Sequence, residues 1–273
     1  MTDQSAGSGG ASAARKALDV LGSFGPADRV MSLSAIARRS GLALSTAHRV
    51  VGELVEWGAL EREPDGRYRI GLRLWEVGAL APRGLALRDV AMPFMEDLYE
   101  VTHEVVQLAV REGTELVFIE RIAGRTSIGV HTRVGGRFVL PASGAGLVLL
   151  AFAPAEVQEQ VLSAPIEVFT PHTVADPAQL RRILAAVRRK DTAVSDRQVT
   201  TDSQSVGAPL RDAGGDVVAA VSVVIRAGTI DIAALEPLVR NAARGISRSL
   251  SGPSALRPAQ GFDDPVVTRR AAR

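Results

Sequence analysis

The chain of 273 residues contains no cysteine, and it also lacks a long apolar run. Without cysteine the sequence has no disulfides, thiolate zinc sites or cysteine nucleophiles, and a reducing cytoplasm is the expected compartment. No stretch reaches about 18 uninterrupted apolar residues, and the opening MTDQSAGSGGASAAR has no apolar signal core. The sequence therefore predicts a protein that is neither secreted nor membrane-spanning.

Signatures of catalysis and metal binding are missing as well. The chain has no HExxH, GxxxxGK[ST] or GxSxG motif, and its four histidines, His48, His103, His131 and His172, show no metal-ligand spacing. Ser143-Gly144-Ala145-Gly146 lacks the first glycine of a nucleophile elbow and the third glycine of a dinucleotide loop. We therefore predict no catalytic residue, no metal and no cofactor.

Positive and negative side chains are nearly equal in number. The formal net charge is +2, and Lys16 and Lys190 are the only lysines. This balance excludes a polycationic coat, and among nucleic-acid binders it suits a sequence-specific one with a local basic surface better than a general one.

Residues 32–73 carry the clearest pattern that is present. A helix is expected over Leu33 to Arg39, with Gly41 supplying the left-handed turn into a second helix from Leu44 to Trp57. On the second helix one side is apolar and the other polar. The apolar side comprises Leu44, Ala47, Val50, Val51, Leu54, Val55 and Trp57.

A β-hairpin is expected directly after this second helix. Leu60-Glu61-Arg62 and Tyr68-Arg69-Ile70 flank Glu63-Pro64-Asp65-Gly66-Arg67, in which proline and glycine favour a turn. Helix, turn, helix and hairpin in this order predict a winged helix-turn-helix, which places its second helix in the major groove of DNA.

Two groups of polar residues are candidates for DNA contact. Short donors at the start of the second helix suit base edges, and arginines suit guanine or phosphate. The alternative is that the serine and threonine only cap the helix and that the charges are solvated surface. The candidates are Ser45, Thr46, His48 and Arg49 for bases, and Arg38, Arg39, Arg67 and Arg69 for phosphates.

The remaining chain divides into a connector and a second domain. The domain limits are 1–12 and 251–273 as disordered ends, 13–73 for DNA binding, 74–84 as helical linker, and 85–250 for the second domain. Expected helices are 14–24, 72–80, 85–101 (with Pro93 kinking or restarting it), 144–152, 154–162, 176–190 and 232–250. Expected strands are 105–110, 115–122, 127–130, 136–140, 192–195, 205–211 and 217–226. These patterns predict an antiparallel sheet with packed helices.

The glycine-rich start of the helix at Ser143 has two possible roles. Its exposed N–H groups and positive dipole end offer a seat for a carboxylate or carbonyl. Alternatively, glycines stand there because the helix packs closely against a neighbour.

Taken together, the chain resembles the IclR family of bacterial transcription regulators over roughly residues 13–250. The matching segments are Arg15 to Leu21, Leu33 to Leu42, Ser45 to Arg49, Tyr68 to Gly71, Arg133-Val134-Gly135, Ala208 to Asp212 and Val217 to Ser222. The resemblance implies a GAF-like α/β effector-binding domain, dimers joined through the DNA-binding half and connector, and often tetramers. It also implies control of the catabolism of small organic or aromatic compounds.

The resemblance also places an effector pocket on this chain. The chain departs from the family pattern at several positions, which puts the identity of the ligand in doubt. Leu147 stands where the family usually has a lysine, and Asp191-Thr192 where it has a glycine and an aromatic residue. Gln198 and Asp202 replace an acidic residue and a glycine. Each pocket serine could equally be a satisfied polar group of a strand, and Asp202 a solvated charge. The implied residues are Ser143, Gly144, Ala145, Ser195, Asp196, Asp202, Ser205, Ser222 and Val224.

We therefore expect a two-domain α/β regulator: a winged helix-turn-helix and a GAF-like sensor joined by a helical connector. Its expected partners are double-stranded DNA at an inverted repeat, a small-molecule effector and further copies of the chain. Two alternatives stay open: an architectural DNA-binding oligomer without a ligand, and an enzyme that regulates its own synthesis. Turnover of a bound compound, or failure to bind any, would discriminate.

Overall fold

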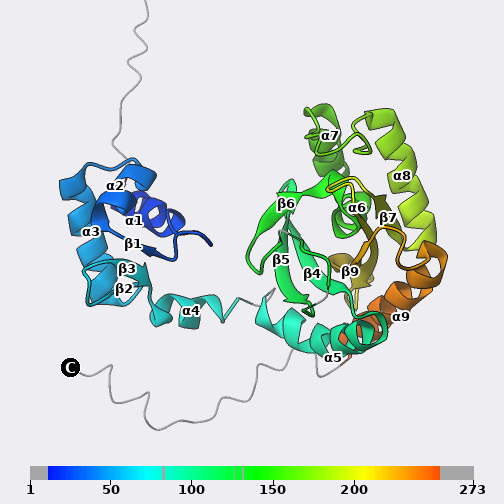
Figure 1. The fold of residues 1–273 in the computed structure, drawn as a ribbon, viewed down its shortest axis with the longest axis horizontal. Helices are drawn as coiled ribbons and strands as arrows, with labels where there is room; N and C mark the ends of the chain where they lie inside the picture. Colours follow the sequence, from blue (N-terminus) through cyan, green and yellow to red (C-terminus); the bar gives the residue numbers. More distant parts are fainter. Residues whose placement is uncertain (1–11, 82–83, 126, 131, 253–273) are drawn as a thin grey trace, which may run out of the picture. The chain divides into compact units, whose positions relative to one another are not determined.

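The computed structural model describes residues 12–81, 84–125, 127–130 and 132–252 (Figure 1). It divides into two compact units, Met1–Ala81 and Pro82–Arg273. Most of the two ends expected to be disordered, the expected helix break at Pro82-Arg83, and His131 lie outside the described residues. Ser12 and Ser251, which we assigned to those ends, instead flank the first and last helices.

The first unit follows the predicted order of helix, helix-turn-helix and hairpin. Its elements are α1 (Ala13–Gly22), β1 (Val30–Met31), α2 (Leu33–Ser40), α3 (Leu44–Trp57), β2 (Leu60–Arg62), β3 (Tyr68–Ile70) and α4 (Leu72–Gly78). The short strand β1 was not predicted; it pairs with β3, so the hairpin becomes a three-stranded sheet of order β1-β3-β2.

Local chemistry explains the sharp turn between α2 and α3. The side chain of Ser32 caps α2 by accepting from the N–H of Ala35, and Gly41 ends the helix at φ 68°, as its left-handed position requires. Ala47, Val50 and Val51 of α3 are buried, as predicted. Leu44 and Trp57 are exposed, so their placement on the buried side was wrong: the core is shorter than the helix.

The second unit is a sheet with helices on both faces. Its elements are α5 (Leu85–Thr102), β4 (Val105–Glu112), β5 (Glu115–Ile122), β6 (Arg137–Val139), the 3-10 turn η1 (Leu140–Ala142), α6 (Gly144–Ala151), α7 (Ala155–Ser163), α8 (Pro177–Lys190), β7 (Ala193–Asp196), β8 (Ser203–Arg211), β9 (Val217–Arg226) and α9 (Ile232–Leu250). Pro93 lies inside α5, which continues through it.

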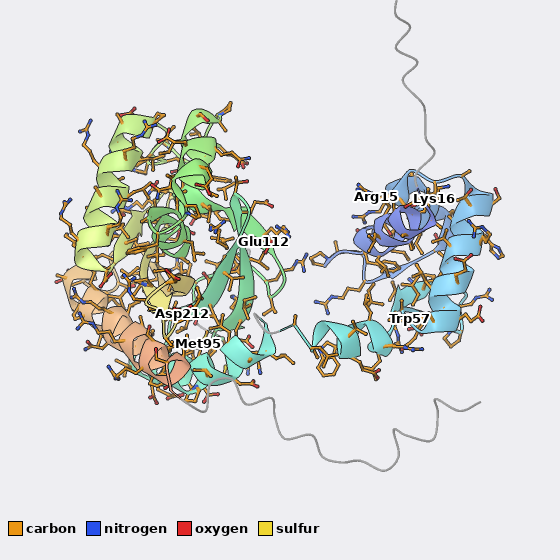
Figure 2. The ribbon with its side chains drawn as sticks, turned by 180° about the vertical axis from the view of Figure 1, so that it is seen from behind. Arg15, Lys16, Trp57, Met95, Glu112 and Asp212 are labelled. Atoms are coloured by element: carbon orange, nitrogen blue, oxygen red, sulfur yellow. The ribbon has the colours of Figure 1, made fainter. Side chains whose placement is uncertain are left out.

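Six antiparallel strands form the sheet in the order β6-β5-β4-β9-β8-β7. Helices α5 and α9 pack on one face, where Met95 is fully buried, and α6, α7 and α8 pack on the other (Figures 1 and 2). Successive residues of a strand point to opposite faces. On β9, Val221 and Val223 therefore face α5 and α9, whereas Ala220 faces α6.

The predicted strand over Ser127–Val130 is wrong. This segment is a loop, in which the Ser127 hydroxyl accepts from the N–H of Gly124 at 2.9 Å and donates to the carbonyl of His103 at 3.0 Å. Ile128 is nevertheless buried against Val105 and Val224. Alternating apolar residues here reflect burial in a loop, since β5 already pairs with β4 and β6.

Candidate DNA interface and ligand cavity

Helix α3 presents three of the four residues proposed to read bases. Ser45, His48 and Arg49 are exposed, and Thr46 is half-buried. The N-cap of α3 is Ala43, and within the described part of the chain no side chain makes a capping hydrogen bond there. The structure therefore does not support the alternative that Ser45 and Thr46 cap the helix, and their hydroxyls are available for contact with DNA.

The arginines of α3 and the wing tip are held in exposed ion pairs. Arg49 lies 2.6 Å from Glu53, one helical turn further along, and Arg67 lies 2.7 Å from Asp65. Hydrogen bonds from the backbone and side chain of Arg67 lower the pKa of the Asp65 carboxyl. Exposed pairs of this kind contribute little to stability, so a phosphate or base can replace either carboxylate.

Arg38 and Arg39, in the last turn of α2, differ in their surroundings. Arg39 pairs with Asp28, whereas Arg38 is exposed and has no ion pair among the residues that the structure describes. Arg38 is thus the predicted phosphate contact with the least competition from neighbouring carboxylates.

Arg69 is tied into the wing itself. Its guanidinium lies 2.7 Å from Glu61 and 2.8 Å from Glu63. The hydrogen bond from Arg69, together with one from the N–H of Leu72, holds the pKa of Glu61 below its ordinary value. These two ion pairs connect Arg69 to the neighbouring strand and to the turn of the wing, and its contact with a phosphate stays a prediction.

A cavity of about 90 Å³ lies in the second unit between the start of α6 and the strands beneath it. Four of the predicted effector residues line it: Ser143, Ser195, Ser205 and Val224. Seven further lining residues were not predicted, and with these four they define the ligand cavity. They are Gln107, Val130, Thr132, Phe138, Val199, Thr200 and Ser203.

Close packing of glycines positions helix α6 at this cavity. A Cβ on Gly207 of β8 would lie 2.5 Å from the carbonyl carbon and oxygen of Gly144, and one on Gly146 would lie 2.1 Å from the carbonyl oxygen of Leu140. Glycine is required at these positions for helix and strand to approach. The close-packing explanation of the glycine-rich segment is therefore correct.

Two N–H groups at the start of α6 are already bonded within the chain. The N–H of Gly144 donates to Ser205 Oγ at 3.0 Å, and the N–H of Gly146 donates to Ser143 Oγ at 3.1 Å. The predicted seat for a carboxylate on these amides is thus partly taken. Each serine hydroxyl that accepts such a bond keeps its own hydrogen to donate into the cavity.

The other polar groups of the ligand cavity are also oriented. Ser195 donates to the carbonyl of Ala142 at 2.7 Å, and the side-chain amide of Gln107 donates to Thr132. Among the residues that the structure describes, no charged side chain lines the cavity, and Phe138 and three valines supply its apolar part. The site offers hydroxyl donors beside an apolar wall.

Five predicted effector residues do not line the ligand cavity. Gly144 and Ala145 are buried in packing around α6, and Ser222 is buried on β9 opposite Gln107 and Gly207. Asp196 and Asp202 are exposed, where Asp202 lies 3.6 Å from Arg226 and Asp196 accepts from Gln204 at 2.8 Å. For Asp202 the structure favours the solvated charge.

Some of the missed residues had a signal in the sequence. Gln107 is the only polar residue of the apolar run Val105–Val110, and an amide buried in a strand needs a partner. Thr132, Val199 and Thr200 lie in loops, where no periodicity points toward a cavity. Gln198, one of the departures from the family pattern, is buried and accepts from the N–H of Val174 at 3.1 Å, so it shapes the loop.

No helix in the described part of the chain combines the length and apolar content that a membrane crossing requires. The described residues likewise hold no group of three or more histidine and acidic side chains able to bind a metal.

Comparison with known proteins relates both units to one family. The model of the bacterial transcriptional regulator IclR C-terminal domain matches residues 81–248, which is more than half of the chain, and the IclR helix-turn-helix domain matches residues 13–64. The HTH-type transcriptional regulator BhcR of Paracoccus denitrificans is 30% identical over 88% of this chain and 88% of its own length.

Solved structures give the same relation. An IclR homologue from Microbacterium hydrocarbonoxydans, complexed with 4-hydroxybenzoate, is 39% identical with a TM-score of 0.83, covering 88% of this chain and 99% of its own. The Thermotoga maritima IclR is 29% identical with a TM-score of 0.72, covering 88% and 98%. The curated relatives are named transcriptional regulators, which confirms the prediction of a regulator and not an enzyme. The chain therefore belongs to the IclR family of transcriptional regulators, with an N-terminal helix-turn-helix for DNA and a C-terminal α/β domain.

Proposed function

We propose that a small organic or aromatic acid, or a related carbonyl compound, binds in the ligand cavity and controls DNA binding. The observation that carries this proposal is the lining of the cavity, where hydroxyl donors stand beside an apolar wall and no described residue contributes a charged side chain. The 4-hydroxybenzoate bound to the Microbacterium homologue supports this ligand class.

The polar groups decide how such a ligand is held. Ser143 and Ser205 each accept an N–H of α6 and retain a hydrogen to donate, so a ligand oxygen at this end of the cavity receives two hydroxyl bonds. Phe138 stacks on Phe169 at a ring separation of 5.3 Å, which fixes the apolar wall. The ligand is therefore bound through hydrogen bonds and apolar contact rather than through a salt bridge.

Filling the cavity tests this assignment. A thermal-shift screen of organic and aromatic acids, beginning with 4-hydroxybenzoate, should find a compound that stabilises the wild-type chain. Val224→Phe places a ring into the cavity and should abolish that shift, whereas Val168→Phe, at an exposed position, should preserve it. A compound that stabilises Val224→Phe as strongly as the wild type would bind elsewhere.

DNA binding is proposed to need two copies of the chain. One recognition helix covers one half-site, so two heads on an inverted repeat are required. The first unit carries large apolar side chains that its own core leaves uncovered: Leu72 and Trp75 on α4 are 63% and 62% exposed, and Leu80 is 80% exposed. A second copy covering this face would form the dimer, and a monomer in solution with a single undivided half-site in footprints would contradict it.

The contribution of α3 to DNA recognition can be measured with a matched pair of variants. Arg49 and Arg15 each form an i,i+4 ion pair with an acidic residue, but only Arg49 lies on α3. Arg49→Ala should weaken specific operator binding by about 1 to 3 kcal/mol, and Arg15→Ala should change it little. If Arg49→Ala keeps full operator affinity in a gel-shift titration, Arg49 does not contribute to the DNA interface.

The competing function is an architectural oligomer whose second unit binds no ligand. This function would be favoured if a broad screen of acids found no compound that stabilises the wild-type chain. A regulator of this kind must reach chromosomal DNA, so we propose that the protein is cytoplasmic.

A further inference from the structure

A larger cleft than the ligand cavity lies on the other face of the sheet, along α9. Its volume is about 280 Å³, close to the lower end of small-molecule pockets. Ala208 and Ala243 belong to the core between α9 and the sheet, which separates this cleft from the ligand cavity. We name it the arginine cleft; its lining is Asp191, Ala208, Pro209, Arg211, Arg240, Ala243, Arg244, Ser247 and Arg248.

Three of its arginines form a row on α9. Arg240, Arg244 and Arg248 are spaced four residues apart, so they lie on one side of the helix at intervals of about 6 Å. Like charges at this spacing repel one another, and folding gains nothing from the arrangement. Within the described residues none of these three arginines has an acidic partner, and Arg240 only donates to the carbonyl of Lys190 at 3.3 Å.

The fourth arginine, Arg211, comes from the end of β8 and is fixed from several sides. Its guanidinium lies 2.9 Å from Asp191, donates to the carbonyl of Gly215 at 3.1 Å and stands over the ring of Phe152 at 4.7 Å. Of the described residues that line the cleft, Asp191 is the one acidic residue, and its carboxylate is paired with Arg211. The remaining three positive charges are therefore unbalanced within the cleft.

We infer that the arginine cleft binds a small anion with two or more negative charges, of the kind carried by phosphorylated or polycarboxylate metabolites. Guanidinium groups form paired hydrogen bonds to phosphate and carboxylate oxygens, and a multivalent anion would relieve the repulsion along α9. Ser247 closes the inner side, where its hydroxyl accepts from the N–H of Arg211 at 3.0 Å. This second site is chemically distinct from the ligand cavity, whose described lining carries no charge.

Calorimetry on the full chain tests the inference with inorganic pyrophosphate and with citrate. Arg244→Gln/Arg248→Gln should weaken binding about 100-fold, since each lost charge-assisted bond is worth roughly tenfold. The matched control is Arg182→Gln/Arg189→Gln on α8, which removes the same charge from exposed positions outside the cleft and should bind as the wild type does. Val224→Phe should also leave this binding unchanged.

The outcomes separate the possible sources. Tighter pyrophosphate binding assigns the site to phosphorylated compounds, and tighter citrate binding assigns it to polycarboxylates. Absence of binding of either anion to the wild type, or equal loss in both double variants, would overturn the inference. The inference would also be overturned if the cleft variant lost DNA affinity but kept its anion binding, because the cleft surface would then bind DNA.

Discussion

Gly207→Ala is the substitution whose cost follows most directly from the structure. The new Cβ would lie 2.5 Å from the carbonyl carbon and oxygen of Gly144 and 2.8 Å from the nitrogen of Ala145. Ordinary carbon contacts are about 3.5 to 4.0 Å, so α6 and β8 would have to separate by about 1 Å. The obstructing atoms are all backbone and cannot rotate away. We expect the free energy of unfolding of the second unit to fall by about 3 kcal/mol, at the upper end of the costs of overpacking a core.

Urea unfolding can localise this loss because both tryptophans, Trp57 and Trp75, belong to the first unit. Far-UV circular dichroism follows both units, whereas tryptophan fluorescence follows only the first. Gly207→Ala should lower the dichroism midpoint by about 1 M or more and leave the fluorescence midpoint in place. The control is Gly129→Ala, because a Cβ there meets nothing within 4 Å. An unchanged dichroism midpoint in Gly207→Ala would refute the argument from close packing.

Three further predictions concern stability. Gly52→Ala, inside α3 where an added Cβ meets no atom, should stabilise the first unit by up to about 1 kcal/mol in fluorescence-detected unfolding. Burial raises the pKa of Glu104, whose ionised form therefore destabilises the fold at neutral pH; Glu104→Gln should raise the melting temperature at pH 7 but not below the ordinary glutamate value of 4.5. Arg69 lowers the pKa of Glu61, so their ion pair stabilises the wing above pH 4.5, and this stabilisation is lost as the pH falls through the lowered pKa. In Glu61→Gln, the stability of the first unit, followed by tryptophan fluorescence, should therefore fall less steeply at acidic pH.

The sequence predicted the DNA-binding unit well because its signals are local. Gly41 and the 3.6-residue periodicity of α3 act within a few residues, and both were read correctly apart from the helix ends. The strand β1 is only two residues long and exists because β3 offers it an edge, so no local pattern reveals it.

The ligand cavity was only partly predictable because it depends on contacts between distant segments. Ser143, Ser195, Ser205 and Val224 came from the family resemblance, and the structure brings them together. Gln107 meets Thr132 across 25 residues, through loop geometry that periodicity does not encode. The ion pairs of Arg69 were likewise hidden, because a charge on a wing strand reads as a DNA contact until its neighbours across the hairpin are known.

The alternation along β9 separates two kinds of evolutionary change. Val224 faces the ligand cavity, whereas Val223 beside it packs toward α5 and α9. If the ligand binds as proposed, substitutions at Val224 can alter ligand preference while Val221 and Val223 keep α5 and α9 in place. Such an arrangement lets one scaffold acquire new chemical specificities without rebuilding the layer behind its sensor.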